Sequence, residues 1–152
     1  MADIFTNGKS HKKSRGAKKA QIVTAERVRD FGEVYTNERE VKAMCDLLPR
    51  EIWENIGATF LEPSCGNGNF LVEILARKLA ICKTEEDAKR ALKSITGIDI
   101  LADNVRASKE RMFAMVQAKF PTINKAAAMR ILNKQIICGD SLKIMKEWEN
   151  EQ

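Results

Sequence analysis

Closely spaced metal ligands are missing from this sequence. It contains a single histidine, and no two of its four cysteines form a Cys-x-x-Cys pair. Zinc sites and disulfide frameworks depend on such spacings, so both are disfavoured, and we predict no metal site. The cysteines are predicted to be reduced and mostly buried, like other small apolar side chains. They are Cys45, Cys65, Cys82 and Cys138.

Long apolar runs are missing as well. No stretch approaches the roughly 20 residues that a membrane-spanning helix requires. The N-terminus lacks the basic and then apolar order of a signal peptide. We therefore expect a cytoplasmic protein with no membrane partner. A chain of 152 residues has room for one domain with a modest core.

The net charge of +5 is concentrated near the N-terminus. Residues 1–30 hold eight Lys or Arg against three Asp or Glu, whereas the rest of the chain holds 18 of each sign. Because these cations are interspersed with Gly and Ser, residues 1–23 are predicted to form a basic, flexible tail. Such a tail either contacts nucleic-acid phosphates without regard to sequence or is a solvated leader. In both cases we assign the basic character to the tail and not to a folded face.

Apolar periodicity divides the remaining chain into an N-terminal helical segment, 24–57, and an α/β domain, 58–152. Helices are predicted over about 24–30, 38–48, 70–80, 84–92, 103–120 and 125–132, and strands over 58–61, 94–100 and 135–138. Either Thr36 or Asn37 is expected to cap the second helix, and Thr84 the helix that ends near 92. The long helix over 103–120 is expected to be amphipathic, with an apolar side formed by Val105, Met112, Phe113 and Val116. Strands that alternate with helices predict a parallel sheet, here of about three strands with flanking helices.

Each predicted strand is followed by a carboxylate. Glu62, Asp99 and Asp140 come after the first, second and third strands. Ligands of open parallel sheets bind outside the carboxyl ends of the strands, so these residues are candidate site residues. Asp99 is placed to accept from the hydroxyls of a ribose, and Ile100 beside it to cover an adenine ring. Asp140 is placed to accept from an adenine amino group.

The loop after the first strand contains two glycines that favour a tight turn. Gly66 and Gly68 have no Cβ, so the backbone there can approach a ligand closely. A dinucleotide-binding fingerprint needs a third glycine at position 71, which is Leu71, so an NAD or FAD site is disfavoured. No Gly-Lys-Ser/Thr sequence follows, which excludes a Walker phosphate loop.

Four short sequences carry a resemblance to one enzyme family. Gly32–Thr36, Glu62–Phe70, Gly97–Ile100 and Gly139–Leu142 are similar, in this order, to four motifs of class I S-adenosyl-L-methionine-dependent methyltransferases. The Glu-Pro-Ser-Cys-Gly-Asn-Gly-Asn-Phe run has the form typical of DNA adenine-N6 methyltransferases of restriction–modification systems. The sequence departs from the pattern at Asn37, where proline is usual.

The resemblance implies a partial Rossmann-like class I methyltransferase fold and S-adenosyl-L-methionine as cofactor. The implied cofactor-binding residues are Tyr35, Thr36, Glu62, Pro63, Gly66, Asn67, Gly68, Phe70, Asp99, Ile100, Asp140, Ser141 and Leu142. Among these, Tyr35 and Thr36 would hold the methionine end of the cofactor. Asp99 would bind its ribose hydroxyls.

Local structural roles would explain several of the same residues. The two glycines could serve only the turn, and Asp99 and Asp140 could serve as helix caps. Tyr35 and Thr36 could be used in local packing, and Phe70 fits the core better than a cofactor contact. These alternatives stay open at the level of the sequence.

The family's catalytic motif is not found in the chain. That motif, Asp/Asn/Ser-Pro-Pro-Tyr/Phe, follows the fourth strand and holds the flipped-out adenine. The prolines here are Pro49, Pro63 and Pro121, none adjacent to another. We therefore expect no catalytic residue in this chain and no methyl transfer by it alone. The resemblance to the Gly-Asp-Ser-Leu esterase signature is set aside, because no histidine follows Ser141.

The leading hypothesis is that the chain is the cofactor-binding part of a DNA adenine methyltransferase. Its expected partners are DNA and a second part that completes the enzyme. The completing part would be a separate polypeptide, the remainder of a longer protein, or a second copy. In the family a fourth strand pairs with the first, so we predict an open sheet edge at 58–61 that favours association. Two other hypotheses remain: a non-catalytic cofactor- or nucleic-acid-binding module or remnant, and part of an RNA or protein methyltransferase.

Overall fold

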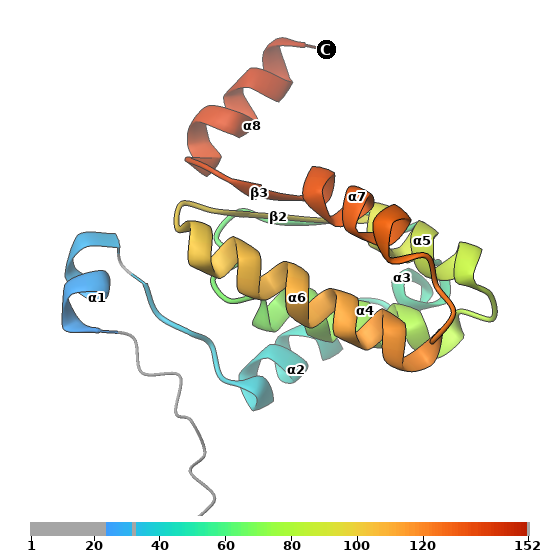
Figure 1. Ribbon diagram of the computed structural model, residues 1–152. Coiled ribbons are helices and arrows are strands. Elements are labelled where there is room, and N and C mark those ends of the chain that lie inside the picture. The colour runs from blue at the N-terminus through green and yellow to red at the C-terminus, as the bar shows by residue number, and fades with distance from the viewer. Residues whose placement is uncertain (1–23, 32, 152) are drawn as a thin grey trace, which may run out of the picture.

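The order of helices and strands follows the sequence pattern (Figure 1). The computed structural model describes residues 24–31 and 33–151. The predicted tail, 1–23, and Gly32 of the first motif lie outside the described residues. Of the helices that are described, none is both long and apolar enough to cross a membrane.

Three short helices precede the sheet: α1 (Ala25–Phe31), α2 (Glu38–Asp46) and α3 (Arg50–Glu54). Of the two candidate caps, the structure selects Asn37, whose side-chain oxygen accepts a hydrogen bond from the Glu40 N–H at 3.0 Å. Asn37 thus caps α2 at the position where the family pattern has proline. Helix α2 ends at Asp46, two residues earlier than predicted, and Pro49 directly precedes the first residue of α3.

The three strands form one parallel sheet, as predicted. Strands β1 (Phe60–Glu62), β2 (Ile95–Asp99) and β3 (Ile136–Cys138) lie in the order β1-β2-β3. The first strand begins two residues later than expected. The carbonyl of Ala58 is hydrogen-bonded to the amino group of Lys78 at 2.7 Å, and Phe60 N–H makes the first backbone bond toward β2. A buried side chain therefore replaces the sheet as the partner of Ala58.

Five helices complete the fold: α4 (Asn69–Ile81), α5 (Glu85–Lys93), α6 (Ala102–Lys119), α7 (Lys125–Gln135) and α8 (Ser141–Asn150). Helices α4 and α6 pack against each other and against β2, on the side of the sheet away from α8 (Figure 1). Helices α5 and α7 pack side by side and lead into β2 and β3. Thr84 caps α5, as predicted, in a reciprocal pair of hydrogen bonds with Asp87.

The core lies between the sheet and helices α4 and α6. Leu71 and Leu75 of α4, and Met112 and Val116 of α6, are fully buried against it. Their spacing of four residues puts each pair on one helix face, and full burial of each side chain contributes about 1.5–3 kcal/mol. The apolar face predicted for the long helix is confirmed.

One lysine is buried in this core. Lys78 is fully buried, and its amino group donates to the carbonyls of Ile56 and Ala58, both at 2.7 Å. Burial lowers the pKa of Lys78 to about 8. The two hydrogen bonds fasten the segment before β1 to the last turn of α4.

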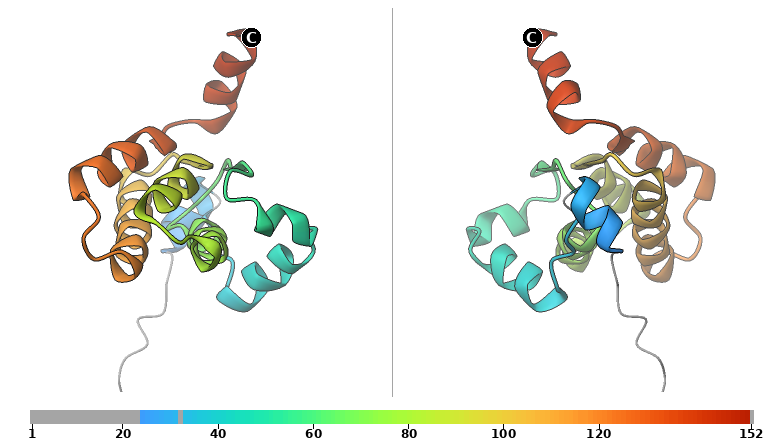
Figure 2. Two further views of the ribbon diagram at one scale, coloured as in Figure 1. Left: turned by 90° about the vertical axis from the view of Figure 1, so that its right-hand side faces the viewer. Right: turned by 90° about the vertical axis from the view of Figure 1, so that its left-hand side faces the viewer.

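Among the described residues, both outer strands of the sheet are unpaired on one side, and the last helix stands apart. Within the described chain, β1 pairs with β2 alone, and Leu61 in β1 is 47% exposed. Helix α8 projects away from the rest of the molecule in all three views and has no buried residue (Figures 1 and 2). The open side of β1 lies at the predicted edge, whereas α8 follows β3 at the other edge of the sheet.

The cysteines are free, and three of them are buried. Cys45, Cys65 and Cys82 are covered by the fold, as predicted, whereas Cys138 at the end of β3 is exposed. Burial, together with the negative charge of Asp99, raises the pKa of Cys65 to about 12. Cys65 is therefore a protonated packing residue beside the glycine loop.

Candidate functional site

Two adjoining hollows open at the carboxyl ends of the strands. The main hollow has a volume of about 320 Å³ and is lined by residues from α1 and the loops after β1, β2 and β3. The side hollow, of about 110 Å³, lies between the Val34–Thr36 segment and the glycine loop. Both are lined by Val34, Ser64 and Gly66, so they form one continuous depression.

Twelve of the thirteen predicted site residues line these hollows. The main hollow takes Pro63, Gly66, Asp99, Ile100, Asp140, Ser141 and Leu142. The side hollow takes Tyr35, Thr36, Glu62, Asn67 and Phe70, and shares Gly66. Gly68 lines neither of them. Segments that are far apart in the sequence thus meet where the carboxyl ends of parallel strands meet.

The two loop glycines have left-handed backbone conformations, with φ of +53° at Gly66 and +91° at Gly68. A Cβ on Gly68 would lie 2.7 Å from the hydroxyl oxygen of Ser108 on α6. A Cβ on Gly66 would lie 3.3 Å from the Tyr35 ring. Gly66 therefore keeps the hollow open, whereas Gly68 lets the loop cross α6 closely. The glycine predicted as a ligand contact at 68 has a packing role in the structure.

The Asp99 carboxylate is buried and holds the loops together. One oxygen accepts from the Gly66 N–H at 2.9 Å. The other accepts from the Leu101 N–H at 2.9 Å and from the Asn104 side-chain amide at 3.2 Å. Asp99 is only 8% exposed yet still lines the main hollow. Since a carboxylate oxygen can accept two hydrogen bonds, the oxygen bonded to Gly66 retains acceptor capacity toward a ligand.

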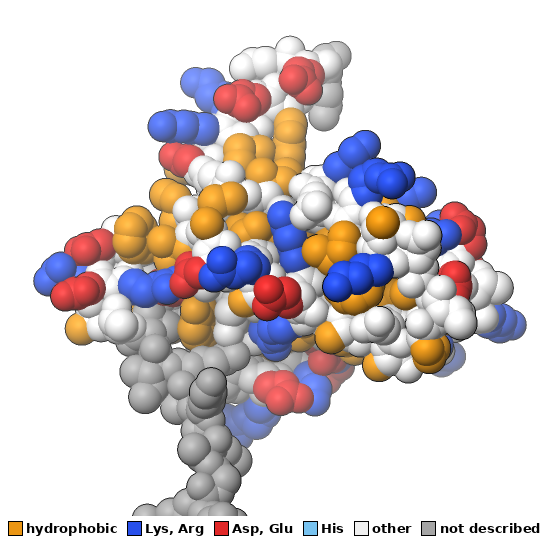
Figure 3. Space-filling model, viewed as in Figure 1, with side chains coloured by type: hydrophobic (Ala, Val, Ile, Leu, Met, Phe, Trp, Pro, Cys, Tyr) orange, Lys and Arg blue, Asp and Glu red, His pale blue; other side chains and the backbone are white. Residues whose placement is uncertain are grey.

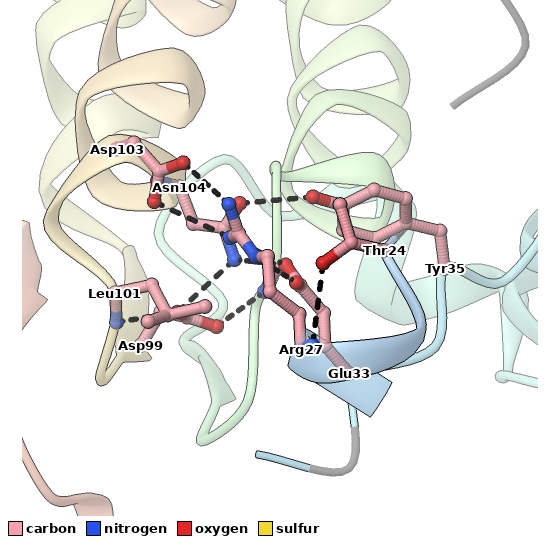
Figure 4. A network of polar contacts seen from close by, with 9 residues as sticks. Thr24, Arg27, Glu33, Tyr35, Asp99, Leu101, Asp103 and Asn104 are labelled. Carbon is pink, nitrogen blue, oxygen red and sulfur yellow. Dashed lines mark hydrogen bonds and ion pairs between the residues drawn. The ribbon is translucent and has the colours of Figure 1, made fainter. Parts of the chain in front are cut away.

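A polar network behind Asp99 ties α1 to the site (Figure 4). The Asn104 amide also donates to Glu33 at 2.6 Å, and its carbonyl oxygen accepts from the Tyr35 hydroxyl at 3.0 Å. Arg27 of α1 forms ion pairs with Glu33 and with Asp103. Asn104 is thus the common partner of the first motif and the end of β2.

Two pKa shifts follow from this network. Burial and the neighbouring Glu33 carboxylate raise the pKa of Tyr35 to about 12, so its hydroxyl stays protonated and donates. Burial by itself would raise the pKa of Glu33, but hydrogen bonds from Asn104 and Arg27 lower it below its ordinary value. Glu33 is therefore a buried anion that its partners compensate.

Asp140 acts as the cap of α8. Its side-chain oxygen accepts from the backbone N–H groups of Leu142 at 3.0 Å and Lys143 at 3.4 Å. The capping role considered for Asp140 is therefore present, and the same residue lines the main hollow. Glu62 has a similar local role, because its carboxylate accepts from the Ser64 N–H at 3.2 Å.

The side hollow contains a buried acceptor that has no donor. The side-chain oxygen of Asn67 is buried without a hydrogen-bond partner in the described chain, although Asn67 lines this hollow. Burial of an unpaired carbonyl costs about 1–3 kcal/mol. A ligand with an N–H or O–H group would satisfy this oxygen. Nearby Phe70 is half-buried, packs against the core as the packing alternative expected, and also lines the side hollow.

The two hollows share a charge pattern that limits the ligand. Carboxylates of Glu33, Glu62, Asp99 and Asp140 lie along their walls, and no Lys or Arg is among the described residues that line either one. Exposed apolar side chains stand around the main hollow, with Ile100 54% and Leu142 77% exposed. Such walls suit a flat apolar ring that carries hydroxyl or cationic groups and disfavour a bare phosphate.

Several residues of the site were not predicted as site residues. Phe31, Glu33, Val34 and Ser64 line the main hollow, and Asn104 organises its base. Glu33 and Val34 lie inside the first motif, at positions that its pattern leaves free, so only their place in that motif pointed to them. Asn104 gave no signal, because a polar residue in an amphipathic helix is expected on the solvent side.

Comparison of the chain with protein-family models, with curated proteins and with solved structures finds no match. The four motifs and the hollows that their residues line are therefore the features that point to a function.

Proposed function

We propose that the two hollows bind S-adenosyl-L-methionine, as the cofactor-binding part of a DNA adenine-N6 methyltransferase. One observation carries this proposal. Residues predicted from four separate motifs converge on a single continuous depression at the carboxyl end of the sheet. The ends of three parallel strands meet in any such sheet, but the strand order does not require the Tyr35–Thr36 segment to reach the same depression. Its arrival there supports the resemblance from which the residues were taken.

The chemistry of the walls fits this cofactor. Its adenosine is a flat ring with ribose hydroxyls, which suits the main hollow with Ile100, Asp99 and Asp140. Its methionine end has an ammonium group, which suits the unpaired Asn67 oxygen and the Glu62 carboxylate of the side hollow. Its sulfonium is cationic, and the absence of Lys and Arg among the described lining residues favours a cation over a dinucleotide's pyrophosphate.

When bound, S-adenosyl-L-methionine supplies an electrophilic methyl group. The residues of this chain would position the cofactor. Asp99 would accept a further hydrogen bond from it, and the Tyr35 ring, which lies beside Gly66, would close that side of the site. The Pro-Pro motif, which would supply the acceptors for the amino group of the target adenine in DNA, is not found in the sequence. Proximity and orientation would provide much of the rate once such a partner completes the site.

Isothermal titration calorimetry with S-adenosyl-L-methionine tests the binding site. Ile100→Asp places a charge against the adenine position at a side chain that is already 54% exposed, so the fold should tolerate it. We expect this variant to bind at least about tenfold more weakly, which corresponds to about 1.4 kcal/mol. Leu47→Asp, at an 83% exposed leucine outside both hollows, is the matched control and should bind like the native chain.

A folded native chain that releases no binding heat with S-adenosyl-L-methionine would contradict the proposal. So would equal losses in the two variants, because the effect would then belong to surface charge and not to the hollow. NAD, which carries a pyrophosphate, should bind much more weakly than S-adenosyl-L-methionine in the same titration.

The open edge of β1 supports the need for a completing partner. Exposed Leu61 and the unpaired backbone of β1 would be covered by a further strand from another chain, from more of the same protein or from a second copy. We expect the isolated chain to transfer no methyl group to DNA. Methylated DNA after incubation with the purified chain, or a monomer that stays monodisperse on dilution in light scattering, would count against this part of the proposal.

A further inference from the structure

The end of the sheet opposite the hollows has a groove of the opposite charge. Helices α5 and α7 pack side by side, and a groove of about 480 Å³ lies along them. Four cations line it: Lys89 and Lys93 from α5, and Arg130 and Lys134 from α7. Figure 3 shows basic side chains gathered over these two helices. The prediction that basic character would be confined to the tail is therefore wrong at this groove.

These cations come in pairs that their own helices do not favour. Lys89 and Lys93, and likewise Arg130 and Lys134, are four residues apart and so share one helix face. Like charges at this spacing destabilise a helix by a few tenths of a kcal/mol per pair. Two such pairs facing one groove add to this repulsion, so the arrangement is unfavourable unless an anion is bound.

Most of this charge has no partner in the described chain. Only Lys89 forms an ion pair, with the exposed carboxylate of Glu86 at 3.0 Å. Lys93, Arg130 and Lys134 have no carboxylate within 4.0 Å among the described residues. Gln135 in the same groove is already engaged, since its amide contacts the Lys93 carbonyl and the Thr96 hydroxyl.

Compensation of the helix dipoles explains only part of the pattern. Lys93 and Lys134 lie in the last turns of α5 and α7, where a cation offsets the negative helix end. Lys89 and Arg130 lie a turn further back, and this effect falls off within the last turn. Ala127 and Ile131 form a half-buried apolar strip between the cations.

We propose that the α5–α7 groove binds the phosphodiester backbone of a nucleic acid. Positive side chains placed along both walls match a polymer with a regular row of single negative charges. The site needs no contact with base edges, so we expect binding that is insensitive to base sequence. Because the groove lies at the strands' amino end, it is independent of the cofactor proposed for the hollows.

The test is fluorescence-anisotropy titration of labelled duplex DNA, duplex RNA and single-stranded DNA with the full chain across a salt series. The groove variant is Lys93→Gln, Arg130→Gln, Lys134→Gln. Its matched control changes the same three charges at exposed positions without an ion pair: Arg39→Gln, Lys83→Gln, Lys146→Gln. Both keep the basic residues of 1–23, so the tail contributes equally to each.

We expect the groove variant to bind at least about tenfold more weakly than the control at low salt. Its slope of log affinity against log salt should be lower by about 2–3, since each phosphate contact contributes about 0.9 for duplex DNA. A loss of affinity for all three nucleic acids would support recognition of the phosphodiester backbone that they share. A loss for one of them would identify which nucleic acid the groove binds. Arg130→Lys keeps the charge and should retain binding.

Equal binding by the groove variant and the control would overturn the proposal. An equal loss of affinity for a labelled polyglutamate peptide would also overturn it, because the groove would then be a general site for acidic chains. Circular dichroism on heating checks that the variant is folded. Its affinity for S-adenosyl-L-methionine should equal that of the control, so failure of this proposal is distinguishable from failure of the proposed function.

Discussion

Charged side chains have different roles at the two ends of the sheet. At the carboxyl end the buried carboxylates of Glu33 and Asp99 each accept hydrogen bonds from named donors, and Arg27 joins Glu33 to Asp103. At the amino end, Lys93 and Arg130 line a groove without an ion pair in the described chain. The first set of charges is part of the fold, and the second set is available to a ligand.

This difference separates stability from binding. A charge that already has partners inside the fold is destabilising to remove, because it leaves those partners unsatisfied. A charge that is repelled by its neighbours is harmless or favourable to remove, unless it serves a ligand. Substitutions at the carboxyl end should therefore lower the free energy of unfolding much more than substitutions at the amino end.

The largest effect is expected at Asn104, the shared partner of Glu33, Asp99 and Tyr35. Asn104→Ala should lower the free energy of unfolding by about 2–3 kcal/mol, since it leaves buried polar groups unsatisfied. Urea denaturation measures this change. Asn133→Ala, at an exposed position of α7, is the control and should change stability by less than about 0.5 kcal/mol. Similar values for the two variants would mean that the network is not part of the fold's stability.

A smaller, pH-dependent effect is expected at Glu33. Its pKa is lowered in the folded chain, so the unfolded chain binds the proton more readily. The stabilisation is fully present at neutral pH and is lost as pH falls below the ordinary value of 4.5 and through the folded pKa. Glu33→Gln removes this dependence. Thermal unfolding from pH 7 to pH 3 should therefore show the native chain losing its advantage over the variant, and a constant difference would contradict the assignment.

The smallest effect on stability is expected in the α5–α7 groove. Lys93→Gln, Arg130→Gln, Lys134→Gln should leave the free energy of unfolding within about 0.5 kcal/mol of the native value. The relief of like-charge repulsion and the loss of the helix-end interactions of Lys93 and Lys134 act in opposite directions, and both are screened by salt. The difference from the native chain should therefore shrink in high salt. Thermal unfolding at low and high salt measures it. A loss of more than about 1 kcal/mol would show that these cations belong to the fold after all.

Local patterns in the sequence were sufficient to predict most of the fold. Apolar spacing predicted α4 and α6, Thr84 predicted the start of α5, and alternation of elements predicted the parallel sheet. The start of β1 was missed because Lys78, twenty residues away, takes the Ala58 carbonyl. No local sequence pattern predicts a hydrogen-bond partner at that separation.

The residues that line the site were predicted from motifs, but the polar network that holds them in place was not. Twelve predicted residues line the hollows, but the Glu33–Asn104 bond joins positions 71 residues apart. The groove was missed for another reason. The charges of residues 31–152 sum to zero, and a sum says nothing of how helix packing separates Lys93 and Arg130 from the acids.

The close crossing of the glycine loop and α6 restricts side-chain size at two positions far apart in the sequence, 68 and 108. Ser108 already occupies the space that the smallest side chain at 68 would need. A Cβ at 68 would also lie 3.2 Å from the Ser108 Cα and would have to adopt the left-handed φ of +91°, so a smaller residue at 108 would not compensate for it. In a library that randomises both positions, folded clones should keep glycine at 68 and pair it with serine or a smaller residue at 108.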